Sequence, residues 1–80
     1  MLTRVAALSL APTIRVNAVA PGPVEKPVGM SEERWAQLGS ELPLRRPGSG
    51  ADVGEAVAFL AENDYITGET LWVDGGDHLR

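Results

Sequence analysis

The chain has 80 residues, a formal charge of −4 and no cysteine. A chain of this length forms at most one small domain, which buries only about 60% of its unfolded surface, and no disulfide or thiolate metal site can add to its stability. The acidic balance argues against nucleic acid or a membrane as partner, because both require a basic footprint. No apolar run approaches the roughly 20 residues of a membrane span, so we expect a soluble, cytoplasmic protein.

Residues Leu2 to Leu10 are predicted to form a helix. Apolar side chains recur there near helical spacing, and Pro12 ends the pattern. Met1 stands directly against the pattern, with no Ser, Thr, Asp or Asn before it to cap the first free N–H groups. We therefore expect the first turns of this helix to be missing.

The apolar run from Ile14 to Ala20 is typical of a parallel strand that is covered on both faces. Pro21 lacks a backbone donor and ends the ladder, while Gly22 lets the backbone turn closely past its neighbours. In open parallel sheets, ligands bind at this carboxyl end of the strands. We expect an inner strand of a larger sheet, with one edge left without a partner in this chain.

A short helix follows a mobile connection at residues 25–29. Ser31 is its predicted N-cap, Glu32 and Glu33 lie in the favourable first turn, and the segment stays helical through Leu38. Residues 43–50 then form a Pro/Gly-rich connection without periodicity.

The longest predicted helix runs from Ala51 to about Glu62 and begins with a capping box formed by Ser49 and Asp52. Its apolar stripe consists of Val53, Ala56, Val57 and Leu60. The glycines at its start superficially match a phosphate-binding loop. No buried strand precedes them, however, and Asp52 would repel a pyrophosphate, so we reject that interpretation.

The last predicted strand covers Glu69 to Val73. Turn signals at residues 63–64 and 67–68 precede it, and Asp74-Gly75-Gly76 ends it with a turn that needs relaxed backbone angles. Two parallel strands in one sheet require a helical crossover between them. The predicted order is therefore helix, strand, helices, strand.

Two of these stretches carry a family resemblance. Residues 14–24, I-R-V-N-A-V-A-P-G-P-V, resemble the penultimate strand and Pro-Gly loop of the short-chain dehydrogenase/reductase family. Residues 66–76 resemble that family's last strand, and residues 44–60 resemble the crossover between them. The resemblance implies an α/β fold that is the C-terminal fragment of a Rossmann-type doubly wound parallel sheet. Residues 1–80 would then be a partial domain that lacks the N-terminal dinucleotide-binding and catalytic part.

The resemblance implies hydride transfer between NAD or NADP and a carbonyl or alcohol, catalysed by a Ser, a Tyr and a Lys. None of these can be placed here. Tyr65 is the only tyrosine and is followed four residues later by Glu69 rather than a lysine. Lys26 is the only lysine and stands where the family usually has a threonine. We assign no catalytic residue, and we expect this chain alone to be inactive and not to bind the cofactor.

By resemblance, Pro21, Gly22, Pro23 and Val24 line the nicotinamide, with the Val24 backbone bonded to the carboxamide. These four residues are called the Pro-Gly loop below. The alternative is an ordinary turn that ends a strand.

The same resemblance makes Met30, Trp35 and Leu38 part of a helix that closes over the substrate. The alternative is that these side chains pack on a small core, as apolar residues at helical spacing usually do. His78 is a lone histidine near a terminus with no second nitrogen or sulfur ligand nearby in sequence, so no metal site is predicted.

Three functions remain open. The chain is part of a short-chain oxidoreductase, or a complementing module that pairs its exposed strand edge with a partner chain, or a small structural domain. In the first two cases we expect self-association or a partner chain that covers the edge. The substrate is not determined, although a similar crossover and last strand occur in short-chain reductases that act on pteridines.

Overall fold

The computed structural model describes all 80 residues and contains the predicted elements in the predicted order. The elements are α1 (Leu2–Leu10), β1 (Ala18–Pro21), α2 (Glu32–Ser40), α3 (Gly50–Glu62), β2 (Thr70–Val73) and a final 3-10 turn, η1 (Asp77–Leu79). None of the helices has the length and apolar character needed to cross a bilayer.

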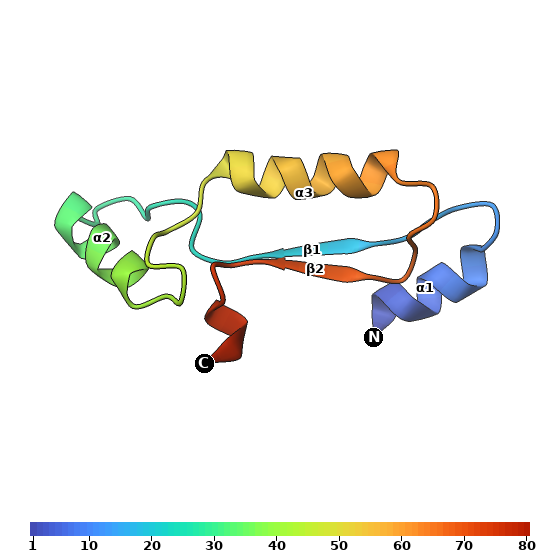
Figure 1. Cartoon of the computed structure of the whole chain (residues 1–80), viewed down its shortest axis with the longest axis horizontal. Coiled ribbons are helices and arrows are strands. Elements are labelled where there is room, and N and C mark those ends of the chain that lie inside the picture. Colours follow the sequence, from blue (N-terminus) through green and yellow to red (C-terminus); the bar gives the residue numbers. More distant parts are fainter.

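The two strands form a parallel sheet, and α3 is the crossover that connects them. Ala18 lies opposite Thr70 and Pro21 lies opposite Val73. Figure 1 shows α3 running along one face of the sheet, while α1 lies near one end of the strands and α2 beyond the other. This arrangement confirms the predicted fold class, an α/β fragment built around two parallel strands.

The first strand is shorter than predicted, because hydrogen bonds to side chains interrupt the ladder before Ala18, where only the Gly68 N–H still donates to a backbone group, the Val16 carbonyl, at 2.7 Å. Asn17 donates from Nδ2 to the Ile66 carbonyl at 3.0 Å, and its Oδ1 accepts from the Glu69 N–H at 3.0 Å. The Val16 N–H donates to the Thr67 hydroxyl at 3.1 Å. The opposite segment is a turn rather than a strand, so an amide side chain satisfies backbone groups that a regular ladder would otherwise pair.

Pro21 lies inside the strand rather than beyond it, and its missing donor costs no bond to β2. The N–H groups of Ala18 and Gly22 donate to the Glu69 and Val73 carbonyls. Because backbone groups alternate between the two edges of a parallel strand, Val19 and Pro21 direct theirs to the other edge. That edge has no neighbour in this two-stranded sheet.

The prediction that β1 is covered on both faces is wrong for this chain. Ala18, Val19 and Ala20 are only half-buried, because α3 covers one face and no element lies flat on the other (Figure 1). The buried apolar side chains are those of Ala7, Leu42 and Leu60. The radius of gyration is 15.2 Å, whereas a compact domain of this length has about 12 Å. The elements therefore form an extended layer with a thin core.

The helix starts agree with the sequence. Ser31 caps α2 by accepting from the Arg34 N–H at 3.0 Å, and the capping box of Ser49 and Asp52 starts α3. At the other end of α3, the Arg15 guanidinium donates to the Leu60 and Ala61 carbonyls at 2.8 and 3.0 Å. This contact fastens the residues before β1 to the negative end of the helix dipole.

Candidate site at the carboxyl ends of the strands

Gly22 allows the ends of the two strands to approach closely. A Cβ atom at this position would lie 2.5 Å from the Asp74 Cβ and 2.7 Å from its Cα. The Gly22 N–H donates to the Val73 carbonyl at 3.0 Å, so β1 and β2 stay paired up to this residue. Only a residue without a side chain fits here, and the Pro-Gly loop therefore leaves β1 directly beside the start of the Asp74 turn.

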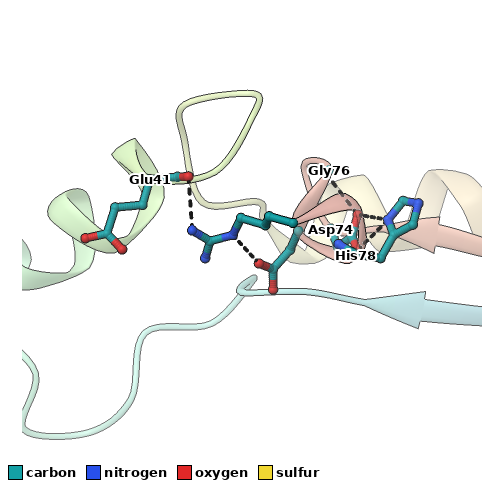
Figure 2. A network of polar contacts seen from close by, with 6 residues as sticks. Glu41, Asp74, Gly76 and His78 are labelled. Atoms are coloured by element: carbon teal, nitrogen blue, oxygen red, sulfur yellow. Dashed lines mark hydrogen bonds and ion pairs between the residues drawn. The ribbon is translucent and has the colours of Figure 1, made fainter.

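A cavity of about 290 Å³ lies at this point, where the sequence predicted the ligand end of the sheet. The residues that give it its character come from both strand ends and from the connection before α3: Pro23, Leu44, Arg46, Trp72, Asp74 and His78. The Leu44 N–H donates to the Gly75 carbonyl at 3.0 Å. Arg80 also donates to the Glu41 carbonyl at 3.2 Å, so the C-terminal turn is tied to the segment after α2 (Figure 2).

Asp74 is the one charged side chain that is buried, with 8% of its surface exposed. Its carboxylate accepts from the Gly76 N–H at 3.0 Å and the His78 N–H at 2.9 Å. Both of its oxygens also contact Nδ1 of His78, at 3.0 and 2.9 Å (Figure 2). Burial acts to raise the pKa of Asp74, but the hydrogen bonds from His78 and Gly76 outweigh it and hold this pKa below its ordinary value.

The turn that places these groups depends on left-handed backbone angles. Gly75 and Gly76 have φ values of 63° and 92°, as the sequence predicted for this turn. The turn reverses the chain so that His78 comes back against Asp74.

His78 is therefore at the surface but not isolated, which corrects the sequence interpretation. Its ring is bonded to Asp74 and stacks on Trp72, with centroids 4.9 Å apart and planes 16° from parallel. Trp72 and Asp74 lie two residues apart on one side of the strand end, and the turn brings the imidazole over the indole. No three His, Cys, Asp or Glu side chains come together as a metal-binding cluster.

A second ion pair borders the cavity. Arg46 donates to Oδ2 of Asp52 at 3.2 Å. The hydrogen bond from Arg46, followed by those from the Ser49 N–H and hydroxyl, holds the pKa of Asp52 below its ordinary value. The Asp52 carboxylate is thus ionised and bonded at the start of α3, where it would repel a phosphate group.

Of the Pro-Gly loop only Pro23 lines this cavity, and Val24 follows it directly along the chain. The Pro23 carbonyl accepts from the Gly48 N–H at 2.9 Å, and this bond fixes the loop against the connection before α3. The N–H and carbonyl of Val24, by contrast, make no hydrogen bond within the chain. A donor and an acceptor are therefore available side by side, which is the pattern that a primary carboxamide complements.

Met30, Trp35 and Leu38 are half-buried and do not line the cavity. They belong to α2 and the residue before its cap, and α2 lies beyond the strand ends (Figure 1). Lys26, at the position where the family usually has a threonine, forms an ion pair with Glu32 at the start of α2. That Met30, Trp35 and Leu38 close over a substrate stays a prediction.

A helix, a parallel strand with a Pro-Gly loop, a helical crossover and a second parallel strand define a Rossmann-type sheet fragment with its ligand end at the cavity. Residues 1–78 match the family model described as Enoyl-(Acyl carrier protein) reductase. The chain belongs to the short-chain dehydrogenase/reductase family.

The relatives agree with this assignment. Glucose 1-dehydrogenase of Gluconobacter oxydans is 48% identical over 69 residues, which are 79% of this chain and 26% of that protein. A glucose and ribitol dehydrogenase homolog of Oryza sativa is 44% identical over 80 residues, 92% of this chain and 27% of its own length. The NADP complex of FolM Alternative dihydrofolate reductase 1 from Brucella suis has a TM-score of 0.87 and 42% identity. It fits the likeness to pteridine reductases noted in the crossover and last strand.

The match covers 99% of this chain but only 32% of the FolM structure. The chain thus spans about a quarter to a third of the length of these relatives. The Asp74, His78 and Trp72 cluster was not anticipated from the sequence. The sequence did hold a signal for this cluster. Asp74 and His78 are four residues apart, and Trp72 lies two residues before Asp74, so the two side chains point to the same side of a strand.

Proposed function

We propose that this chain forms the C-terminal part of an NAD(P)-dependent oxidoreductase that transfers a hydride between the nicotinamide and a small alcohol or carbonyl compound. The observation that carries the proposal is the free N–H and carbonyl of Val24, the residue directly after Pro23, which lines the cavity at the carboxyl ends of the strands. The family membership and the NADP complex of the Brucella relative support it.

The residues of this chain fit one side of a nicotinamide. The Val24 N–H would donate to the carboxamide oxygen, and its carbonyl would accept from the carboxamide nitrogen. Pro23 and the side chain of Val24 would lie along the ring and exclude water from it. The nicotinamide supplies or accepts the hydride when bound. The proton would be handled by the family's Ser, Tyr and Lys set, which residues outside this chain would contribute, because no such set can be placed in it.

The chain alone should therefore not oxidise NADPH with carbonyl substrates above the buffer rate. It also lacks a pyrophosphate site, so the contacts to the nicotinamide side are too few to offset the entropy of association. Calorimetry that detected micromolar NAD(P) binding to this chain, or turnover that disappeared when one of its residues was mutated, would contradict this expectation.

The positive test replaces the matching C-terminal segment of the Gluconobacter glucose 1-dehydrogenase with this chain. The chimera should form NAD(P)H from glucose. Val24→Pro removes the N–H and should raise the KM for the cofactor about three- to tenfold, the worth of one hydrogen bond.

Val28→Pro is the matched control. Val28 is fully exposed and is the second residue of a turn closed by the Met30 N–H and the Pro27 carbonyl, with Gly29 at φ 88°. Proline suits this position of a type II turn. Equal KM values for Val24→Pro and Val28→Pro would refute the assigned role of Val24.

The second candidate function is a complementing module, and the free edge of β1 favours it. Val19 directs its N–H and carbonyl away from β2, and a groove of about 340 Å³ lies beside that edge between β1 and α3. Val57, predicted as part of the apolar stripe of α3, is half-exposed in this groove. An extended apolar segment from a partner chain would pair with the edge and fill the groove.

Sedimentation of the chain over a range of concentrations tests this second function. We expect self-association or aggregation of the chain alone, relieved when a partner supplies the neighbouring strand. Val19→Pro should weaken the association by removing the outward N–H, whereas Val28→Pro should not. A compact monomer with cooperative unfolding would favour a small structural domain instead.

A further inference from the structure

The imidazole of His78 is held in one orientation, and its contact with Asp74 selects one tautomer of the neutral ring. The Asp74 carboxylate contacts only Nδ1 of the ring, and the stack on Trp72 fixes the ring plane. An ionised carboxylate can only accept hydrogen bonds, so Nδ1 must carry the proton. In the neutral ring, Nε2 then carries a lone pair, and no group of the chain bonds to it.

The charges around the cavity favour an uncharged ligand. Arg46 is neutralised by Asp52, and the remaining carboxylate is that of Asp74. An anion would meet no unpaired cation there, and Arg46 already donates to Asp52 and to the Pro47 carbonyl. The apolar part of the lining comes from Pro23, Leu44 and Trp72. A ligand that fits this cavity is neutral and able to donate a hydrogen bond, and its carbon atoms can lie against the apolar side chains.

We propose that Nε2 of His78 accepts a hydrogen bond from a hydroxyl group of the substrate, and that this contact selects uncharged, hydroxyl-bearing small molecules. The proposal rests on the oxidoreductase function proposed above. His78 acts as a specificity-determining residue, and Asp74 acts through it as a positioning residue that keeps Nε2 free to accept. The side chain of His78 is about one-third exposed and lines the cavity, so a ligand in the cavity can reach it.

The chain offers a clean experiment because His78 is its only histidine. We would label the histidine with nitrogen-15 and titrate the full chain at mildly alkaline pH with xylitol, an uncharged polyol. One hydrogen bond supports only weak binding, so the titration extends to high xylitol concentrations. The expected free state is the Nδ1–H tautomer. Xylitol should then shift the Nε2 resonance saturably toward hydrogen-bonded values, and acetate at matched ionic strength should leave it unchanged.

Asp74→Asn provides a readout that a merely structural role would not move. The amide nitrogen of the asparagine can donate to Nδ1. This favours the other tautomer of the imidazole, in which Nε2 carries the proton and cannot accept a hydrogen bond. We expect xylitol binding to weaken about three- to tenfold, the worth of one hydrogen bond. Asp77→Asn is the matched control, because Asp77 makes its side-chain bond to Arg80 and does not line the cavity. It should bind xylitol as the original chain does.

An Nε2–H tautomer in the unmodified chain, or no saturable shift with xylitol, would overturn the inference even if Asp74→Asn did not fold. A shift with acetate but none with xylitol would also overturn it and would indicate an anion site around Arg46. The outcome is separable from the proposed function. If the chimera reduced NAD(P) but xylitol left the Nε2 resonance of the chain unchanged, the proposed oxidoreductase function would stand and the proposed role of His78 would be refuted.

Discussion

Replacing Gly22 by alanine should destabilise the protein, because no room exists for a methyl group between the strand ends. The added carbon would lie 2.5 Å from the Asp74 Cβ and 2.7 Å from its Cα, whereas non-bonded carbons prefer about 3.5 to 4.0 Å. The obstructing atoms belong to the backbone and to the first carbon of a buried side chain. They cannot move aside without disturbing the carboxylate that organises the C-terminal turn.

The expected magnitude follows from two opposing effects. Overpacking of this kind costs about 1 to 3 kcal/mol. The φ angle of Gly22 lies outside the left-handed region, so alanine is not strained by conformation and recovers about 0.4 to 1 kcal/mol from the unfolded chain. The contacts are so short that we expect the upper part of the overpacking range, about 2 to 3 kcal/mol. The net loss is then about 1 to 2.6 kcal/mol, which lowers the Tm of a domain of this size by about 4 to 21 °C.

Gly54→Ala is the matched control with the opposite sign. A Cβ there meets nothing within 4 Å, and the residue lies inside α3. Alanine is favoured over glycine in a helix by about 0.5 to 1 kcal/mol, so Tm should rise. Far-ultraviolet circular dichroism at one fixed protein concentration measures both changes. If Gly22→Ala melted at or above the temperature of the original chain while Gly54→Ala rose, the inferred close approach of the strand ends would be wrong.

Three further predictions concern stability. Arg15→Ala removes both bonds to the end of α3 and should cost about 1 to 3 kcal/mol in urea unfolding, while the exposed Arg4→Ala should change little. The pKa of Asp74 is lower in the folded state than in the unfolded state, so the unfolded state binds more protons in acid. The stabilisation is complete above the ordinary carboxyl pKa of about 3.9 and is lost as pH falls through the lower folded value. Asp74→Asn should therefore flatten the acid limb of stability measured against pH, and an unchanged limb would contradict it. Val16→Lys should prevent folding or association by placing a charge beside the sheet, whereas Glu33→Lys on the exposed face of α2 should have a small effect, as sedimentation can check.

Much of the local structure could be predicted because its causes lie within a few residues. Ser31 and Ser49 cap helices through bonds to N–H groups three residues ahead. The Asp74-Gly75-Gly76 turn follows from glycine's access to left-handed angles. The order of elements and the position of the Pro-Gly loop at the ligand end of the sheet follow from pattern and crossover rules.

The tertiary structure alone decided the rest, because the deciding contacts join residues far apart in the chain. The start of β1 depends on Asn17 bonding to the turn about 50 residues later, a bond that no local pattern reports. The apolar run of β1 predicted cover on both faces, but cover is a property of neighbours, and this chain supplies only α3. The Asp74 and His78 pair is the exception, because its members are close in sequence. It still required the glycine turn to bring the imidazole back against the Asp74 carboxylate and onto the Trp72 ring. Sequence determines which groups are able to meet; packing determines which of them do, because burial and orientation depend on every element at once.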